Sequence, residues 1–133
     1  MKVGETVFIP DGSSAGRHLW VVIADSEDGS VAMVEFTGYV EGRQDHSCVV
    51  EVGEHPFITK KTVVSYGLGR ILTFNDQRST VNGMKQDRPA DKVLLDKIRK
   101  QLFASDDSSE LMCEFVDAYQ KRIQATQQKD EQT

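Results

Sequence analysis

Between residues 3 and 74, short apolar and β-branched runs alternate with turn residues. Pro10 stops the first run, and the acidic residues and glycine of segment 25–30 are typical of a tight hairpin turn. Short strands at this spacing, with no helical pattern between them, predict a small antiparallel barrel or sandwich. We expect strands at 5–9, 19–24, 31–37, 48–52, 62–66 and 70–74.

The period of the apolar positions changes from two to about three and a half after residue 88, which predicts amphipathic helix. Asp107 and Glu110 have capping-box spacing for a second helix. The first helix follows Pro89 and has an apolar repeat at four-residue steps, Ala90, Leu94, Ile98 and Leu102. The second has an apolar face of Leu111, Met112, Phe115, Val116, Tyr119 and Ile123.

The remaining segments are polar. Residues 75–88 are typical of a linker or loop, and residues 124–133 are rich in glutamine and charge, as in a frayed tail. At 133 residues the chain suits one domain. We expect a mainly β protein with a barrel at 1–80, followed at 81–133 by a linker, two amphipathic helices and a disordered polar tail.

The charge balance limits the possible partners. Lys and Arg number 16 against 21 Asp and Glu, which gives a net charge of −5. Affinity for a nucleic acid comes from cations that neutralise phosphates. A broadly basic nucleic-acid-binding protein is therefore excluded, and any such contact must be a local patch.

Targeting and cysteine signals are weak. Residues 1–5 lack the apolar core of a signal peptide, and no apolar run approaches the length of a membrane span. We expect a cytoplasmic protein with no membrane partner.

Cys48 and Cys113 have no nearby Cys or His at ligand spacing, so we interpret both as buried small hydrophobes.

Residues 16–25 place reactive groups at the rim of an apolar strand. The turn-rich segment 10–16 leads into Arg17 and His18, which are followed at once by an apolar run that contains Trp20. Such a loop leaves the basic pair facing solvent while the tryptophan anchors inward.

Arg17, His18, Thr37 and Arg70 together predict a catalytic set. Guanidinium groups bind phosphate and stabilise developing negative charge, a hydroxyl donates to an oxyanion, and imidazole moves protons. These are the groups needed to cleave RNA through its own 2′-hydroxyl. The alternative is that His18 is a hydrogen-bonded surface group and that Arg17 forms an ion pair with Asp11.

A second set predicts RNA binding: Arg43, His55, Lys60 and Lys61. Tyr39 and Tyr66 would stack bases beside these cations. Alternatively, Tyr66 belongs to the core, the two lysines solubilise a hairpin end, and His55, as the residue before Pro56, only directs the chain into Phe57 and Ile58.

His18, His46 and His55 lie far apart in the sequence and lack carboxylate support at ligand spacing. We expect no metal site and no cofactor.

The order of these segments resembles the ribonuclease toxins of the PemK, Kid and MazF type. Their pattern is a glycine-bearing first strand, a glycine-rich and serine-rich loop before a Val-Val strand, a strand ending in Thr, and a Thr-Val-Val segment followed by Arg-Ile. In this chain it corresponds to Gly4-Glu5-Thr6-Val7, 16–23, 34–37, Thr62-Val63-Val64 and Arg70-Ile71. The match covers about the first 75 residues. It departs from the family at His18-Leu19-Trp20, where the toxins have Arg-Pro and a small residue.

The resemblance implies an SH3-like barrel, often dimeric, that cleaves single-stranded RNA without a metal and is neutralised by an antitoxin protein. It places an RNA-contact or catalytic role on Arg17, Thr37 and Arg70. A non-catalytic barrel is the alternative function. That barrel would bind a peptide or protein partner at its strand edges, near Trp20 and Tyr39, with the helices covering a face or forming a dimer.

Overall fold

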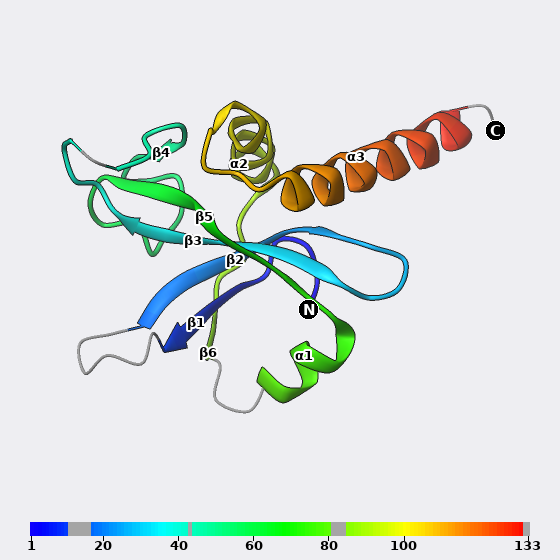
Figure 1. Cartoon of the computed structure of the whole chain (residues 1–133), viewed down its shortest axis with the longest axis horizontal. Coiled ribbons are helices and arrows are strands. Elements are labelled where there is room, and N and C mark those ends of the chain that lie inside the picture. The colour runs from blue at the N-terminus through cyan, green and yellow to red at the C-terminus, as the bar shows by residue number, and fades with distance from the viewer. Residues whose placement is uncertain (11–16, 43, 81–84, 132–133) are drawn as a thin grey trace.

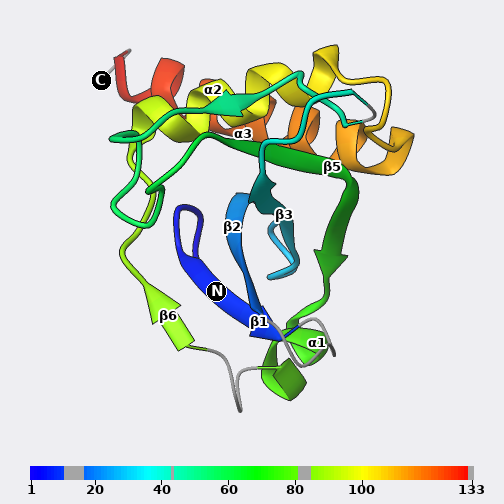
Figure 2. The ribbon, with the colours of Figure 1, turned by 90° about the vertical axis from the view of Figure 1, so that its left-hand side faces the viewer.

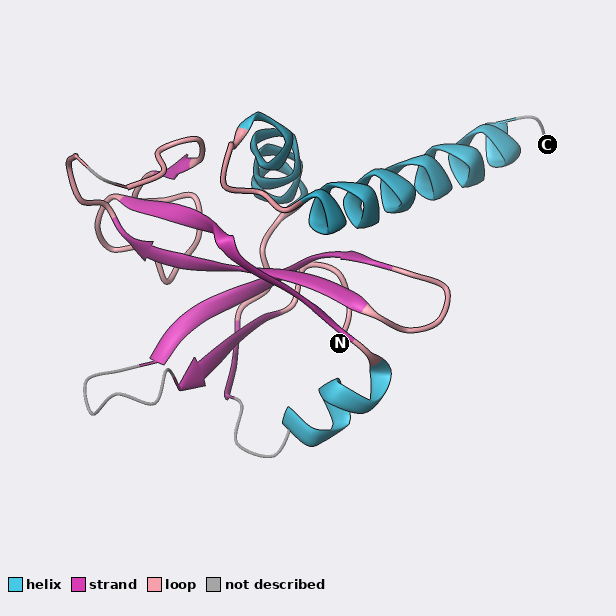
Figure 3. Ribbon diagram, in the orientation of Figure 1, coloured by secondary structure: helices cyan, strands magenta, loops and turns pink. Residues whose placement is uncertain are grey.

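Six antiparallel strands form one sheet that curls into half of a barrel, and the C-terminal helices cover one of its faces (Figure 1, Figure 2). This computed structural model describes residues 1–10, 17–42, 44–80 and 85–131. The elements in chain order are β1 (Thr6–Pro10), β2 (Arg17–Asp25), β3 (Val31–Gly38), β4 (Val49–Val50), β5 (Thr62–Leu72), α1 (Phe74–Thr80), β6 (Lys85–Asp87), α2 (Lys92–Ala104) and α3 (Glu110–Glu131). The mainly β class with helices at the C-terminal end is thus confirmed (Figure 3).

The strand order in the sheet is β4-β5-β3-β2-β1-β6. The expected strands 62–66 and 70–74 fall mostly within one strand, β5, which ends at Leu72 and whose register with β3 shifts between Met33 and Glu35. The shift leaves residues 66–69 as a bulge against α3. A Cβ on Gly69 would lie 2.9 Å from Cε of Met112, a flexible side-chain end that can shift, and 3.1 Å from the backbone carbonyl oxygen of Tyr66, so the absence of a side chain eases this approach.

Residues 75–88, expected to be a linker, contain α1 and β6. β6 adds an edge strand to β1, with Asp87 opposite Thr6. Gln77 of α1 donates to the carbonyl of Gly29 at 2.8 Å and accepts from the amino group of Met1 at 3.0 Å. Contacts between segments so distant in sequence leave no local pattern from which they could be predicted.

The two faces of the sheet have separate apolar cores. On the face covered by α2 and α3, the helix side chains pack against Val21, Ile23 and Val34 and come from Leu94, Ile98, Leu102, Met112 and Val116. The opposite face has a smaller core of Val7, Trp20, Val22, Val31 and Met33. Residues of β2 alternate between these two cores, which explains why the whole strand is apolar.

The helix ends differ from the expectation. Asp91 caps α2 by accepting from the Leu94 N–H at 2.9 Å. Ser109, rather than Asp107, lies before α3 and accepts from the Met112 N–H at 3.1 Å. The helix then continues to Glu131 through most of the segment expected to be a tail. Its glutamine, alanine and lysine residues favour helix, and extending an existing helix costs little.

Both cysteines are free thiols, Cys48 buried and Cys113 half-buried. Burial raises the pKa of the Cys48 thiol, so it stays protonated and apolar in the core. Among the helices that the structure describes, none combines the length and the apolar character needed to cross a bilayer.

Ile98→Ala tests the helix-on-sheet core. Ile98 is completely buried in α2, so we expect the free energy of unfolding to fall by about 2–5 kcal/mol in urea titrations. Val93→Ala in the same helix is the control. Val93 is 76% exposed, and its truncation should change stability by less than about 0.5 kcal/mol. Equal losses would contradict this packing.

Candidate functional site

The sheet splits at one end, where β2 and β3 separate. Their pairing runs from Asp25 and Val31 to Trp20 and Glu35 and then stops. Beyond that point residues 17–19 stay with β1, while residues 36–38 stay with β5. The two pairs of strands diverge in Figure 1. A cleft of about 520 Å³ opens between them.

The floor of this cleft is aromatic. Phe8, Phe36 and Phe57 line it, together with Leu19. The rings of Phe8 and Phe57 meet edge to face, with centroids 5.1 Å apart. Phe57 remains 39% exposed. Exposed phenyl rings in a concave site offer a surface on which a flat ligand can stack.

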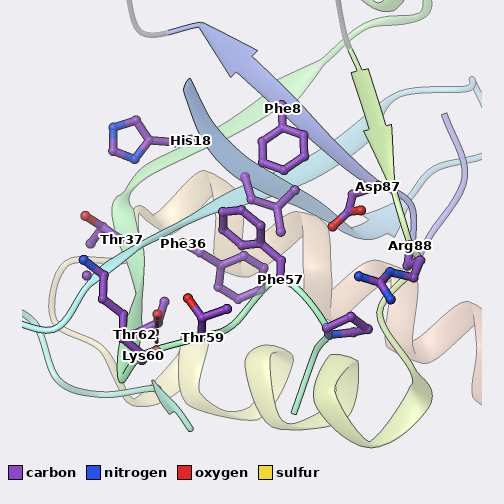
Figure 4. A pocket seen from close by; sticks show the side chains of 13 residues that line it. Phe8, His18, Phe36, Thr37, Phe57, Thr59, Lys60, Thr62, Asp87 and Arg88 are labelled. Atoms are coloured by element: carbon purple, nitrogen blue, oxygen red, sulfur yellow. Dashed lines mark hydrogen bonds between the residues drawn. The ribbon is translucent and has the colours of Figure 1, made fainter. Parts of the chain in front are cut away.

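Polar side chains form the rim on two sides of the rings. His18, Thr37 and Lys60 lie on one side, and Asp87 and Arg88 lie on the other (Figure 4). Three of these five residues carry a basic group. The acidic chain therefore has a local basic rim at this point, as a phosphate-bearing ligand would require.

A buried carboxylate lies behind His18. Nδ1 of His18 is 3.4 Å from Oε1 of Glu35, and the His18 side chain is 36% exposed. Glu35 itself is 8% exposed. A carboxylate beside one imidazole nitrogen orients the ring, which is the arrangement of a proton-transfer group and its positioning partner.

Of the two expected catalytic arginines, Arg70 is absent from the cleft lining that the structure describes. The guanidinium of Arg70 covers the ring of Trp20, with Cζ 4.9 Å from the ring centroid. Arg17 begins β2 and pairs with Pro10. Its side chain is outside the described part of the chain. Of the four expected catalytic residues, the structure brings His18 and Thr37 together in the cleft.

The expected RNA-binding residues are divided in the same way. Lys60 lines the cleft, whereas Lys61 lies over the ring of Tyr39, with Nζ 4.2 Å from the centroid. Arg43 is outside the described residues. Tyr66 is buried and donates to the carbonyl of Ile98 at 2.7 Å, which makes it a core residue.

His55 is 2% exposed, and both of its ring nitrogens have partners. Nδ1 accepts from the Phe57 N–H at 3.0 Å, so Nε2 carries the proton and donates to the carbonyl of Arg88 at 2.7 Å. The same carbonyl accepts from the Thr6 hydroxyl at 2.7 Å. His55 therefore holds the loop of Phe57 against the segment of Arg88, behind the cleft.

Sequence reasoning missed several cleft residues. Glu35 had a visible signal, since it is the one charged residue in the apolar run 31–37. Phe57, Asp87 and Arg88 had none, because loop and edge-strand contacts bring them to the cleft. Among the described residues, no three of the His, Cys, Asp and Glu side chains lie close enough together to hold a metal ion.

Comparisons of this chain with protein-family models, with curated proteins and with solved structures found no match.

His55→Ala tests the joint behind the cleft. The change removes two hydrogen bonds and leaves the Phe57 N–H without its acceptor, so we expect a loss of about 1–3 kcal/mol in the free energy of unfolding. His46→Ala is the matched control. The His46 ring stacks on Tyr39 and bonds the carbonyl of Val40 at an exposed loop. A loss as large in the control would contradict the structural role of His55.

Proposed function

We propose that this protein is a metal-independent endoribonuclease of the PemK, Kid and MazF type, with an SH3-like barrel, that cleaves single-stranded RNA in the cleft between β2 and β3. One observation carries the proposal. His18, with Glu35 behind it, shares an aromatic-floored cleft with Thr37 and Lys60. The antitoxin, the homodimer and the cytoplasmic location belong to the same proposal, because the toxin resemblance implies the first two and the sequence predicts the third.

The cleft favours single-stranded RNA over a duplex. Phe8 and Phe57 offer ring faces, and nucleobases expose their faces only when they are unpaired. Lys60 at the rim, beside the imidazole of His18, supplies positive charge for the phosphate between two such bases. Stacking and phosphate contacts of this kind occur together in proteins that bind single strands.

The reaction needs only proton transfers and charge stabilisation. The 2′-oxygen of the RNA attacks the adjacent phosphorus, and the bond from phosphorus to the 5′-oxygen breaks. His18, held at Nδ1 by Glu35, takes the proton of the 2′-hydroxyl at Nε2, and the leaving oxygen takes a proton from water. Lys60 and the Thr37 hydroxyl stabilise the charge on the phosphoryl oxygens. The products are a 2′,3′-cyclic phosphate and a 5′-hydroxyl.

Both arginines contact the RNA in this proposal, Arg70 from the neighbouring surface. Arg17 precedes His18 in β2, and Arg70 lies on the sheet face that also carries Trp20 and Glu35. RNA that leaves the cleft past His18 would meet the guanidinium group of Arg70, and such groups bind phosphate bidentately.

His18→Ala tests the proton-transfer role. Wild-type protein in excess EDTA should cleave single-stranded RNA and leave cyclic-phosphate ends, because no metal takes part. The variant should be slower by about 100-fold or more, as measured by gel electrophoresis. His46→Ala, in the loop beside Tyr39, should cleave at the wild-type rate. Absence of cleavage by the wild type at any concentration would overturn the proposal and favour the non-catalytic barrel that binds a peptide or protein.

Glu35→Gln tests the positioning role of the buried carboxylate. The amide keeps the shape of the side chain but removes its charge, so we expect kcat to fall while KM for RNA stays unchanged. Glu41→Gln, at an exposed position, is the matched control. A rise in KM with unchanged kcat would show that Glu35 acts in binding instead.

A further inference from the structure

The polar groups of the cleft are separated by its aromatic floor. His18, Thr37 and Lys60 lie on one side of the phenyl rings, while Asp87 and Arg88 lie on the other (Figure 4). A nucleotide has the same division, with its phosphate at one end and the hydrogen-bonding edge of its base at the other. If the phosphate contacts the His18 side, a base stacked on Phe57 extends towards Asp87.

Asp87 is held on rigid backbone. It ends β6 and lies opposite Thr6 in the sheet. The carbonyl of the next residue, Arg88, accepts from both Thr6 and His55 at 2.7 Å. Such fixed placement is what a group needs in order to discriminate between ligands that differ by a single hydrogen bond.

A carboxylate and a guanidinium side by side match one base better than the others. An ionised carboxylate only accepts hydrogen bonds, and a guanidinium only donates them. The pairing edge of guanine has two adjacent donors, N1–H and N2–H, beside one acceptor, O6. Adenine and cytosine present their amino group beside an acceptor nitrogen that the carboxylate would repel, and uracil has a single donor between two carbonyl groups.

We infer that the cleft selects an unpaired guanine, with Asp87 accepting from N1–H and N2–H and Arg88 donating to O6. This inference rests on the proposed function, because it takes the ligand of the cleft to be single-stranded RNA. It adds the identity of the base, which the catalytic residues leave open. Recognition of this kind is lost when the base lacks the N–H group from which the carboxylate would accept a hydrogen bond.

Binding to uncleavable oligonucleotides tests the inference separately from catalysis. The ligands are 2′-O-methyl oligouridylates with one central guanosine, inosine or adenosine. Lacking a 2′-hydroxyl, they can be bound but not cut. Inosine differs from guanosine only by the missing N2 amino group. Fluorescence anisotropy with the wild-type protein should give a Kd for guanosine about tenfold lower than for inosine or adenosine.

Asp87→Asn should abolish the preference between guanosine and inosine, because an amide has one acceptor in place of the two carboxylate oxygens. Asp106→Asn, at an exposed position outside the cleft, should keep it. Equal Kd values for the three oligonucleotides on wild-type protein would overturn the inference, whether or not RNA is cleaved. A guanosine preference without cleavage of ordinary RNA would support the inference and refute the proposed nuclease.

Discussion

The site depends on the separation of β2 from β3 after Trp20 and Glu35. Beyond that point each strand keeps its other neighbour, β2 with β1 and β3 with β5, while the edges that face the cleft lose their pairing with each other. The rim residues His18 and Thr37 lie on strands, which gives them fixed positions, while the loop before β5 carries Phe57 and Lys60.

The backbone carbonyl of Arg88 holds the far wall of the cleft together. It accepts hydrogen bonds from Thr6 in the first strand and from His55, and His55 in turn accepts from the N–H of Phe57. Three segments that are distant in the sequence are thereby held together at a point that is buried but polar. Because His55 is neutral when its Nδ1 accepts a hydrogen bond, this joint brings no charge into the interior.

Much of the fold could be predicted from the sequence, since strand and helix periods are local properties. Trp20 and Val22 alternate with Val21 and Ile23 between two cores, and this double burial is what makes the run in β2 continuously apolar. Two residues of the expected catalytic set, His18 and Thr37, line the cleft because they lie near strand ends. Asp87 and Arg88 could not be predicted as cleft residues, because only the pairing of β6 with β1 brings the polar segment 85–88 to the cleft.

Trp20 has a further consequence, because it is the single tryptophan of the chain. It sits at the last rung before the strands part, is almost fully buried, and lies under the guanidinium of Arg70. Its indole emission therefore comes from one known place, beside Glu35 and next to the opening. The wavelength and intensity of this tryptophan fluorescence therefore depend on the access of water to the point where β2 and β3 separate, and on the position of Arg70.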